Sequence, residues 1–172
     1  MSTRKRTRDN GFSVFRIGVI SAIIGGAFLV GAFVFTTLDQ QGARSPLVID
    51  SPAGAELRDQ EETSGSRRQW YVVGATDAEQ VATYYNQELQ EFYGADTTAA
   101  ELCKRIPASG NYDDYIEGTG MVPYMFKCVF DSSTFQSERF TEVQIEPGVR
   151  NNETGDNLEG SVVVIYTQVW QP

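Results

Sequence analysis

Hydrophobic residues are concentrated in one unbroken run near the start of the chain, residues 17–38. These 22 residues contain no charged side chain and are bounded by Arg16 and Asp39. As a helix the run would reach roughly 30 Å, the thickness of the hydrocarbon core of a bilayer. A helix in a soluble core would have a polar face, which this run lacks. The pattern therefore predicts one transmembrane helix.

A cleaved signal peptide is the alternative interpretation of this run. Signal peptides have a shorter apolar core, about 7 to 15 residues, followed by a small-x-small cleavage site. The run is longer, and residues 39–43 after it contain no good site of that kind. We therefore expect an uncleaved signal anchor.

After the run the pattern changes to that of a linker and then to that of a folded domain. Residues 39–52 combine glutamine, glycine and proline with little periodicity, which is typical of a linker. The short apolar cluster at 47–49 is either an edge strand or a foot that rests on a partner or on the bilayer surface. Residues 53–172 are long enough for one exported domain with its own core.

The clearest element of this domain is an amphipathic helix that begins near Thr76. Thr76 and Glu79 match a capping box, in which each side chain satisfies a backbone N–H group of the first turn. Gly94 stands where a left-handed C-cap belongs. The apolar stripe, spaced by three and four, consists of Ala78, Val81, Ala82, Tyr85, Leu89, Phe92 and Tyr93. We expect this stripe to lie on a sheet, with its tyrosines as core and rim residues.

Runs of β-branched and aromatic residues predict five strands around this helix. We expect them at residues 55–62, 69–73, 124–130, 140–146 and 161–170. Residues 162–166 are apolar on both faces, so the last strand is the best candidate for the centre of the sheet. A second T-x-x-E signature predicts a short helix at 98–103. The order of elements predicts an α+β fold, a small antiparallel sheet with one main amphipathic helix on one face.

Charge is distributed unevenly along the chain and indicates its topology. The first 16 residues carry +4, and the rest of the chain carries −13, which together give the net charge of −9. By the positive-inside rule, residues 1–16 form a cytoplasmic tail of a plasma-membrane protein, and the C-terminal domain is periplasmic or extracellular. We expect membrane lipid as a partner of the anchor and no nucleic acid, because an acidic domain is repelled by phosphate.

Small residues recur along the predicted transmembrane helix. Gly18, Ala22 and Gly26 are spaced by four, and Ala27 and Gly31 repeat this spacing, which predicts a nearly flat face. Flat faces let helix backbones approach closely inside a bilayer. We therefore expect packing against other transmembrane helices, which belong either to a second copy or to a different protein.

The two cysteines, Cys103 and Cys128, predict one disulfide. An even number of cysteines in an exported domain is normally oxidised. The bond would close a 24-residue loop and stabilise the fold by on the order of 3 kcal/mol. A redox role is the lesser alternative, because the C-x-x-C motif is missing, although basic residues adjoin both cysteines.

No set of residues in the sequence matches a catalytic or cofactor-binding pattern. The chain has no histidine, the usual general base and the commonest transition-metal ligand. Two cysteines alone form neither a structural zinc site nor an iron–sulfur cluster, and no glycine-rich phosphate loop is present. We therefore expect a protein that is not an enzyme, with no catalytic residue and no cofactor.

Two loops rich in oxygen atoms, residues 111–117 and 151–159, leave calcium as an alternative. Neither has the spacing of a calcium-binding loop, so we favour solvated acidic loops and predict no metal site. Tyr112 and Tyr115 in the first loop are our prediction for contact with a partner, because tyrosine is favoured at interfaces.

A resemblance rests on the predicted hairpin, with Trp70-Tyr71-Val72-Val73, and on the capped helix that runs from Thr76 through Tyr84-Tyr85 to Leu89. This segment resembles small α+β domains that follow a single anchor in uncharacterised bacterial envelope proteins. The resemblance covers residues 53–94 and the later strand order. It implies an anchored envelope domain and carries over no catalytic residues.

Together these patterns predict a non-catalytic, single-pass accessory subunit of a larger membrane-protein complex, such as a respiratory or photosynthetic assembly. Its helix would pack within the complex, and its exported domain would dock on a partner. The alternative is a membrane-anchored envelope binding module for an ion, a glycan or a small ligand.

Overall fold

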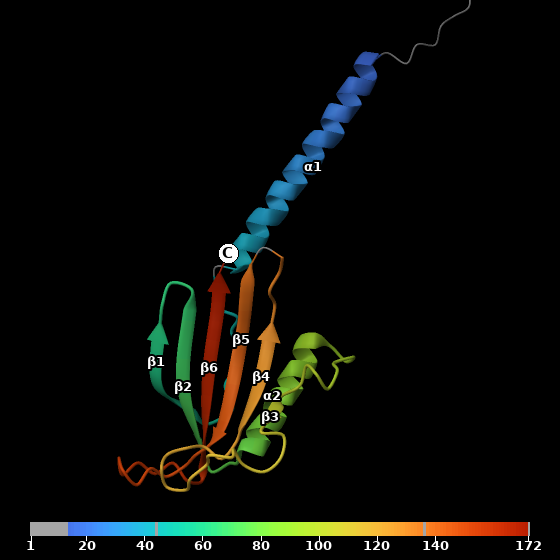
Figure 1. The fold of residues 1–172 in the computed structure, drawn as a ribbon. Coiled ribbons are helices and arrows are strands. Elements are labelled where there is room, and N and C mark those ends of the chain that lie inside the picture. Colours follow the sequence, from blue (N-terminus) through green and yellow to red (C-terminus); the bar gives the residue numbers. More distant parts are fainter. Residues whose placement is uncertain (1–13, 44, 136, 172) are drawn as a thin grey trace, which may run out of the picture. The chain divides into compact units, whose positions relative to one another are not determined.

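The computed structural model describes residues 14–43, 45–135 and 137–171, and the chain divides into two compact units, Met1–Gln41 and Gly42–Pro172. The described residues form two α-helices and one sheet of six antiparallel strands (Figure 1). This confirms the α+β class.

The first unit is built by helix α1 (Val14–Ala43), which contains a candidate membrane span. Residues Gly18–Phe35 have a mean hydropathy of 2.3, and none of them is buried by other parts of the described chain. The Thr37 hydroxyl donates to two carbonyl oxygens of the preceding turn, at 3.0 and 2.9 Å, so this polar group is satisfied within the helix. The helix continues past the predicted end at Leu38.

The second unit is a six-stranded sheet in the order β1-β2-β6-β5-β4-β3, with helix α2 (Ala78–Tyr93) packed against β4 and β5. The strands are β1 (Ala55–Glu62), β2 (Ser66–Gly74), β3 (Lys104–Ile106), β4 (Met125–Asp131), β5 (Glu138–Pro147) and β6 (Ser161–Gln171). The turns between β1 and β2 and between β4 and β5 lie at one end of the sheet, and the β3–β4 and β5–β6 loops lie at the opposite end (Figure 1).

Strand β6 lies inside the sheet, as predicted, because it pairs with β2 along one edge and with β5 along the other. Side chains of alternate residues point to opposite faces of a strand. Those on the face towards α2, including Val162 and Val164, are fully buried, and Ile165 on the other face is also buried. A strand that is apolar on both faces is therefore central here.

The core lies between the sheet and α2. Val81, Tyr85 and Leu89, one side of the helix, are at most 4 % exposed. They meet the buried face of the sheet, made by Val73, Cys128, Phe130, Val143, Ile145, Val162, Val164 and Tyr166. The amphipathic stripe predicted for residues 78–93 is thus the packed face of α2, although Phe92 remains partly exposed.

The N-cap of α2 is Asp77, which corrects the prediction of Thr76. Asp77 Oδ1 accepts a hydrogen bond from the backbone N–H of Gln80 at 2.8 Å. Glu79, expected to reach back in a capping box, instead accepts from the Tyr124 hydroxyl at 2.8 Å. Asp and Thr are both good caps, and the helix begins one residue later than expected because the Asp77 carboxylate, rather than the Thr76 hydroxyl, accepts from an N–H of the first turn. Gly94 is the C-cap, as predicted, but with φ of 96° and ψ of 177° it does not have the left-handed helical conformation expected there.

The short helix predicted at 98–103 is not formed. This segment consists of turns and leads into β3, a strand that the sequence did not predict. Glu101 Oε2 still accepts from the Thr98 N–H at 2.7 Å, so the T-x-x-E signature closes a single turn. The disulfide at Cys103, together with a hydrogen bond from its N–H to Asn86 Oδ1 at 2.9 Å, holds the chain against β4 and α2 in place of a helix.

The segment 45–52, predicted to belong to a linker, lies on the α2-side face of the sheet. Leu47 and Ile49 pack against the core, which is neither of the two alternatives considered for this cluster. The Leu47 carbonyl oxygen accepts from Thr141 Oγ1 at 2.5 Å and from Gln168 Nε2 at 2.7 Å. Thr141 and Gln168 are buried polar residues that need partners, and the backbone of this segment supplies them.

Candidate functional site

The small residues of α1 form two stripes on different sides of the helix, which corrects the single flat face that was predicted. Successive helical residues are about 100° apart, so Gly18, Ala22 and Gly26 follow one side and Ala27 and Gly31 another. A Cβ atom added at Gly18, Gly26 or Gly31 would meet nothing within 4 Å apart from its chain neighbours and the backbone of the helix itself. The second stripe lines a shallow apolar hollow made by Ala27, Phe28, Gly31, Ala32 and Phe35.

Tyr112 and Tyr115, the predicted partner contacts, are both half-buried in the loop between β3 and β4. The Tyr112 N–H donates to the carbonyl oxygen of Pro123 at 2.8 Å, and the Tyr115 N–H donates to that of Tyr112 at 3.1 Å. This loop is therefore folded against its own end. Neither tyrosine lines the clefts described below, and their contact with a partner stays a prediction.

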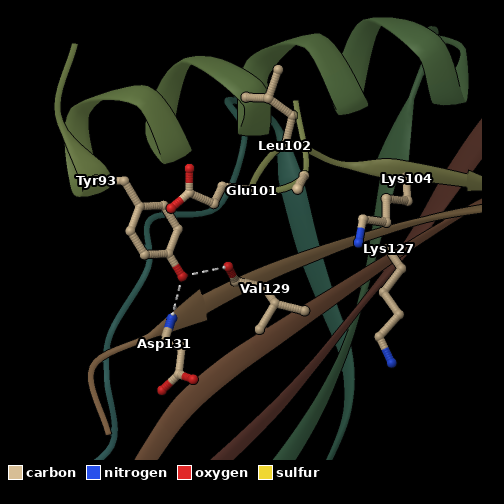
Figure 2. A pocket seen from close by; sticks show the side chains of 8 residues that line it. Tyr93, Glu101, Leu102, Lys104, Lys127, Val129 and Asp131 are labelled. Carbon is tan, nitrogen blue, oxygen red and sulfur yellow. Dashed lines mark hydrogen bonds between the residues drawn. The ribbon is translucent and has the colours of Figure 1, made fainter. Parts of the chain in front are cut away.

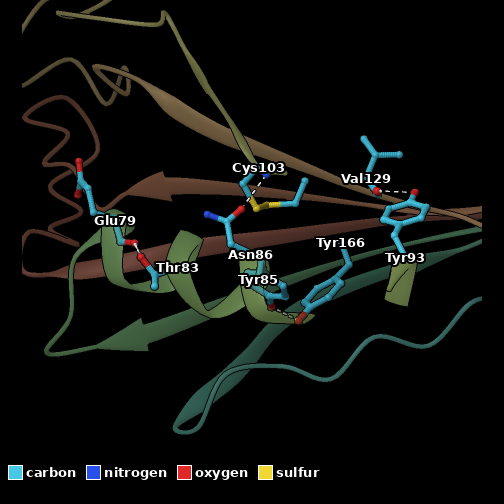
Figure 3. The surroundings of a disulfide bond; sticks show 9 residues. Glu79, Thr83, Tyr85, Asn86, Tyr93, Cys103, Val129 and Tyr166 are labelled. Carbon is cyan, nitrogen blue, oxygen red and sulfur yellow. Dashed lines mark hydrogen bonds between the residues drawn. A yellow bond between two sulfur atoms is a disulfide. The ribbon is translucent and has the colours of Figure 1, made fainter. Parts of the chain in front are cut away.

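The predicted disulfide between Cys103 and Cys128 is present, with an S–S distance of 2.07 Å. It joins the turn before β3 to the middle of β4, beside α2 (Figure 3). Cys128 is fully buried, and the described chain contains no free cysteine. Such a buried bond between two elements is typical of a structural disulfide.

A cleft of about 380 Å³ lies where α2 ends beside the edge of β4 (Figure 2). Strand β3 pairs only with Met125–Lys127, so the backbone of β4 beyond it has no strand partner there. The Tyr93 hydroxyl takes that place, because it donates to the Val129 carbonyl oxygen at 3.0 Å and accepts from the Asp131 N–H at 2.9 Å. The remaining lining residues are Ala100, Glu101, Leu102, Lys104 and Lys127.

Charges of both signs line this cleft. Lys104 and Lys127 are directly opposite in the register of β3 and β4, and Lys127 Nζ forms an ion pair with Glu142 at 2.7 Å. The hydrogen bond from the Thr98 N–H lowers the pKa of Glu101 below its usual value, so this carboxylate stays charged. The cleft thus combines ammonium groups, carboxylates and an apolar wall, which suits a small ligand that carries charge.

A second cleft, of about 250 Å³, lies between the segment 48–51 and strands β2 and β6. Arg67 is held there because its Nε donates to Gln168 Oε1 at 2.8 Å. Tyr71 and Tyr166 also line this cleft, and the Tyr166 hydroxyl donates to the Asp50 carbonyl oxygen at 3.1 Å. The hydroxyl of the fully buried Tyr85 hydrogen-bonds to that of Tyr166 (Figure 3). Burial is the largest cause that raises the pKa of both tyrosines, so both hydroxyls stay protonated.

The described residues contain no group of three or more acidic, cysteine or histidine side chains that could hold a metal ion. In the loop 151–159 the oxygen atoms serve the loop itself, since Asn151 Oδ1 accepts from the N–H groups of Glu153 at 2.9 Å and Thr154 at 3.2 Å. Thr154 Oγ1 donates to Asp156 at 2.7 Å. These bonds close turns within the loop.

Comparison of the chain with protein-family models, with curated proteins and with solved structures finds no match. Function is therefore inferred from the residues and geometry of this chain.

Proposed function

We propose that this protein is a non-catalytic, single-pass accessory subunit, whose helix α1 packs within a larger membrane-protein complex and whose exported domain docks on a partner. The observation that carries the proposal is the hollow on α1, in which Ala27 and Gly31 are flanked by Phe28 and Phe35. Helices in a bilayer associate by close van der Waals packing, which small residues allow. The flanking phenylalanine rings would form the walls of a groove into which a partner helix packs.

The charge distribution and the disulfide support an orientation for this subunit. A basic N-terminal segment is retained on the cytoplasmic side of the plasma membrane, which leaves the domain periplasmic or extracellular. The disulfide between Cys103 and Cys128 fits that compartment, where thiols are oxidised. In this orientation the membrane lipid surrounds α1 wherever no other helix covers it.

The test is the size of the native particle after extraction in a mild detergent. We expect the wild-type chain to run in a complex much larger than a monomer. The variant Ala27→Leu/Gly31→Leu fills the hollow and should release the chain from the complex. The variant Gly18→Leu/Ala22→Leu/Gly26→Leu tests whether the other stripe is also needed to keep the chain in the complex. Val30→Ile, which keeps a β-branched apolar side chain at an exposed position outside both stripes, is the matched control and should leave the particle unchanged.

The outcome that contradicts the proposal is a wild-type chain that runs as a monomer, together with both stripe variants behaving like the control. A complex that contains only copies of this chain would replace the accessory role with self-association. Proteins identified in the large particle would name the complex.

The cleft beside β4 favours a second candidate function, an envelope module that binds a small charged ligand. Its ammonium group at Lys104 and its carboxylate at Glu101 would hold the two ends of a zwitterion. An amino-acid mixture should then raise the melting temperature of the wild-type chain but not of Lys104→Met. If calcium alone raises it, the ligand is an ion and the site lies elsewhere. A glycan ligand would instead be found by a glycan array.

A further inference from the structure

Phe135, in the turn between β4 and β5, is a large apolar side chain without cover. It is 102 % exposed, whereas the next most exposed large apolar residues of the second unit are Val48 at 68 % and Ile116 at 61 %. Single apolar residues on a surface are common and need no explanation by themselves. The structure of the turn and its place in the fold make this one informative.

The turn holds Phe135 at its apex. The Ser132 N–H donates to the Arg139 carbonyl oxygen at 2.9 Å, and the Thr134 N–H donates to that of Ser137 at 2.9 Å. The Arg139 N–H also donates to Ser133 Oγ at 3.0 Å. These bonds close the two sides of the turn, and they leave the Phe135 ring uncovered by the rest of the described chain.

The turn is uncharged in an acidic part of the chain. Residues 132–137 carry no charge and lie between Asp131 and Glu138, while the chain after residue 16 carries −13. An acidic domain is repelled by anionic lipid headgroups. Residues 132–137 are uncharged, so this turn can approach the headgroups without that repulsion.

The turn lies at the end of the sheet where the chain arrives from α1. Arg139 Nε donates to the Ser45 carbonyl oxygen at 3.1 Å, and its Nη2 donates to that of Pro46 at 3.4 Å. Ser45 stands seven positions after Leu38, the last residue of the apolar run, and a chain of seven residues reaches at most about 25 Å. This limit depends on chain length alone. The Ser45 backbone, to which Arg139 at the base of the turn is bonded, therefore stays within about 25 Å of the end of the run.

We propose that the turn between β4 and β5 is a membrane-surface contact, in which Phe135 inserts into the headgroup region of the leaflet that α1 leaves. Aromatic residues are favoured at this depth of a bilayer. The anchor confines the turn near the membrane surface, which raises its effective concentration there. The tethered domain can therefore form a contact that would be too weak to hold a free domain on the membrane. The inference rests on α1 as a membrane anchor and is independent of a partner protein.

The experiment uses the full chain in vesicles of phosphatidylcholine and phosphatidylglycerol that carry shallow spin-labelled lipid. Because the native cysteines form a disulfide, a single new thiol can be labelled with the fluorophore NBD. Phe135→Cys places the label at the apex. Ile116→Cys is the matched control, an exposed apolar position in the β3–β4 loop at the opposite end of the sheet. We expect blue-shifted emission at position 135 and at least about twofold stronger lipid quenching than at position 116.

Hydrogen exchange without a label provides the second measurement. The amides of residues 132–137 should exchange more slowly in the vesicle-bound wild-type chain than in Phe135→Asp, while the amides of β6 remain the same in both. A chain that does not float with the vesicles overturns both the anchor and the contact. A chain that floats but shows equal quenching at 135 and 116, or equal exchange in the two proteins, overturns the contact alone and leaves the proposed helix packing unaffected.

Discussion

The side-chain amide of Gln168 donates to the carbonyl oxygen of Leu47 at 2.7 Å, although 121 residues separate them. The same amide group accepts from Arg67 Nε through its oxygen at 2.8 Å. One residue of β6 therefore fixes both the entering segment and an arginine of β2. Gln168 is only 2 % exposed, so its amide depends mainly on these two partners.

We predict that Gln168→Leu destabilises the second unit by about 1–3 kcal/mol, because the Leu47 carbonyl oxygen loses a buried donor. The free energy of unfolding is measured by urea titration of the purified chain in detergent. Gln87→Leu makes the same chemical change at an exposed position of α2 and should stay within about 0.5 kcal/mol of wild type. Equal effects of the two changes would contradict the role given to the Gln168 amide.

Loss of the disulfide should lower the free energy of unfolding by about 2–5 kcal/mol, as is typical of small exported domains. The variant is Cys103→Ala/Cys128→Ala, measured by the same titration with tryptophan fluorescence. A phosphine reductant should shift the midpoint of the wild-type chain towards that of the variant and leave the variant itself unchanged. A reductant effect on the variant would assign the shift to something other than the bond.

The cap of α2 gives a prediction that separates two adjacent residues. Asp77→Ala should cost about 1 kcal/mol, because the Gln80 N–H loses its acceptor. Thr76→Ala should cost less, since the Thr76 hydroxyl only donates to the exposed Gln80 side chain at 3.2 Å. Thermal unfolding of both variants measures the difference. A larger loss in Thr76→Ala would restore the capping box expected from the sequence.

The buried tyrosine pair predicts how stability depends on alkaline pH. Burial raises the pKa of Tyr85 and Tyr166 above the unfolded value, which is about 10. The folded state therefore binds these protons more tightly, so their stabilising effect is complete below about pH 10 and falls as the pH rises above it. Melting temperatures from pH 8 to 11 should fall more steeply for wild type than for Tyr85→Phe. Identical slopes would refute the linkage.

The predictable parts of this fold are those in which a local pattern is long. The stripe of α2 and the doubly apolar β6 each repeat over many residues, so both were found with nearly correct bounds. Strand β3 has three residues, and its pairing depends on β4 and on the disulfide. The pairing of β3 therefore cannot be predicted from any short segment of the sequence.

The candidate sites were less predictable, because they depend on residues brought together from distant elements. Tyr93 closes the β4 edge from the end of a helix, and no sequence spacing relates it to Asp131. A weak signal existed for Gln168, a polar residue whose alternation with Val164 and Tyr166 places it on the core face of β6. A buried polar side chain requires a partner, but only the fold identifies Leu47 as that partner.

The folded segment at 45–50 determines how mechanical load would enter the second unit. A flexible linker would lengthen under tension and absorb it. Here the chain from Ser45 onward is bonded to side chains of β5 and β6, through Arg139, Thr141 and Gln168. A pull from the N-terminal side would therefore be borne first by these three hydrogen-bonded side chains, and through them by the two central strands of the sheet.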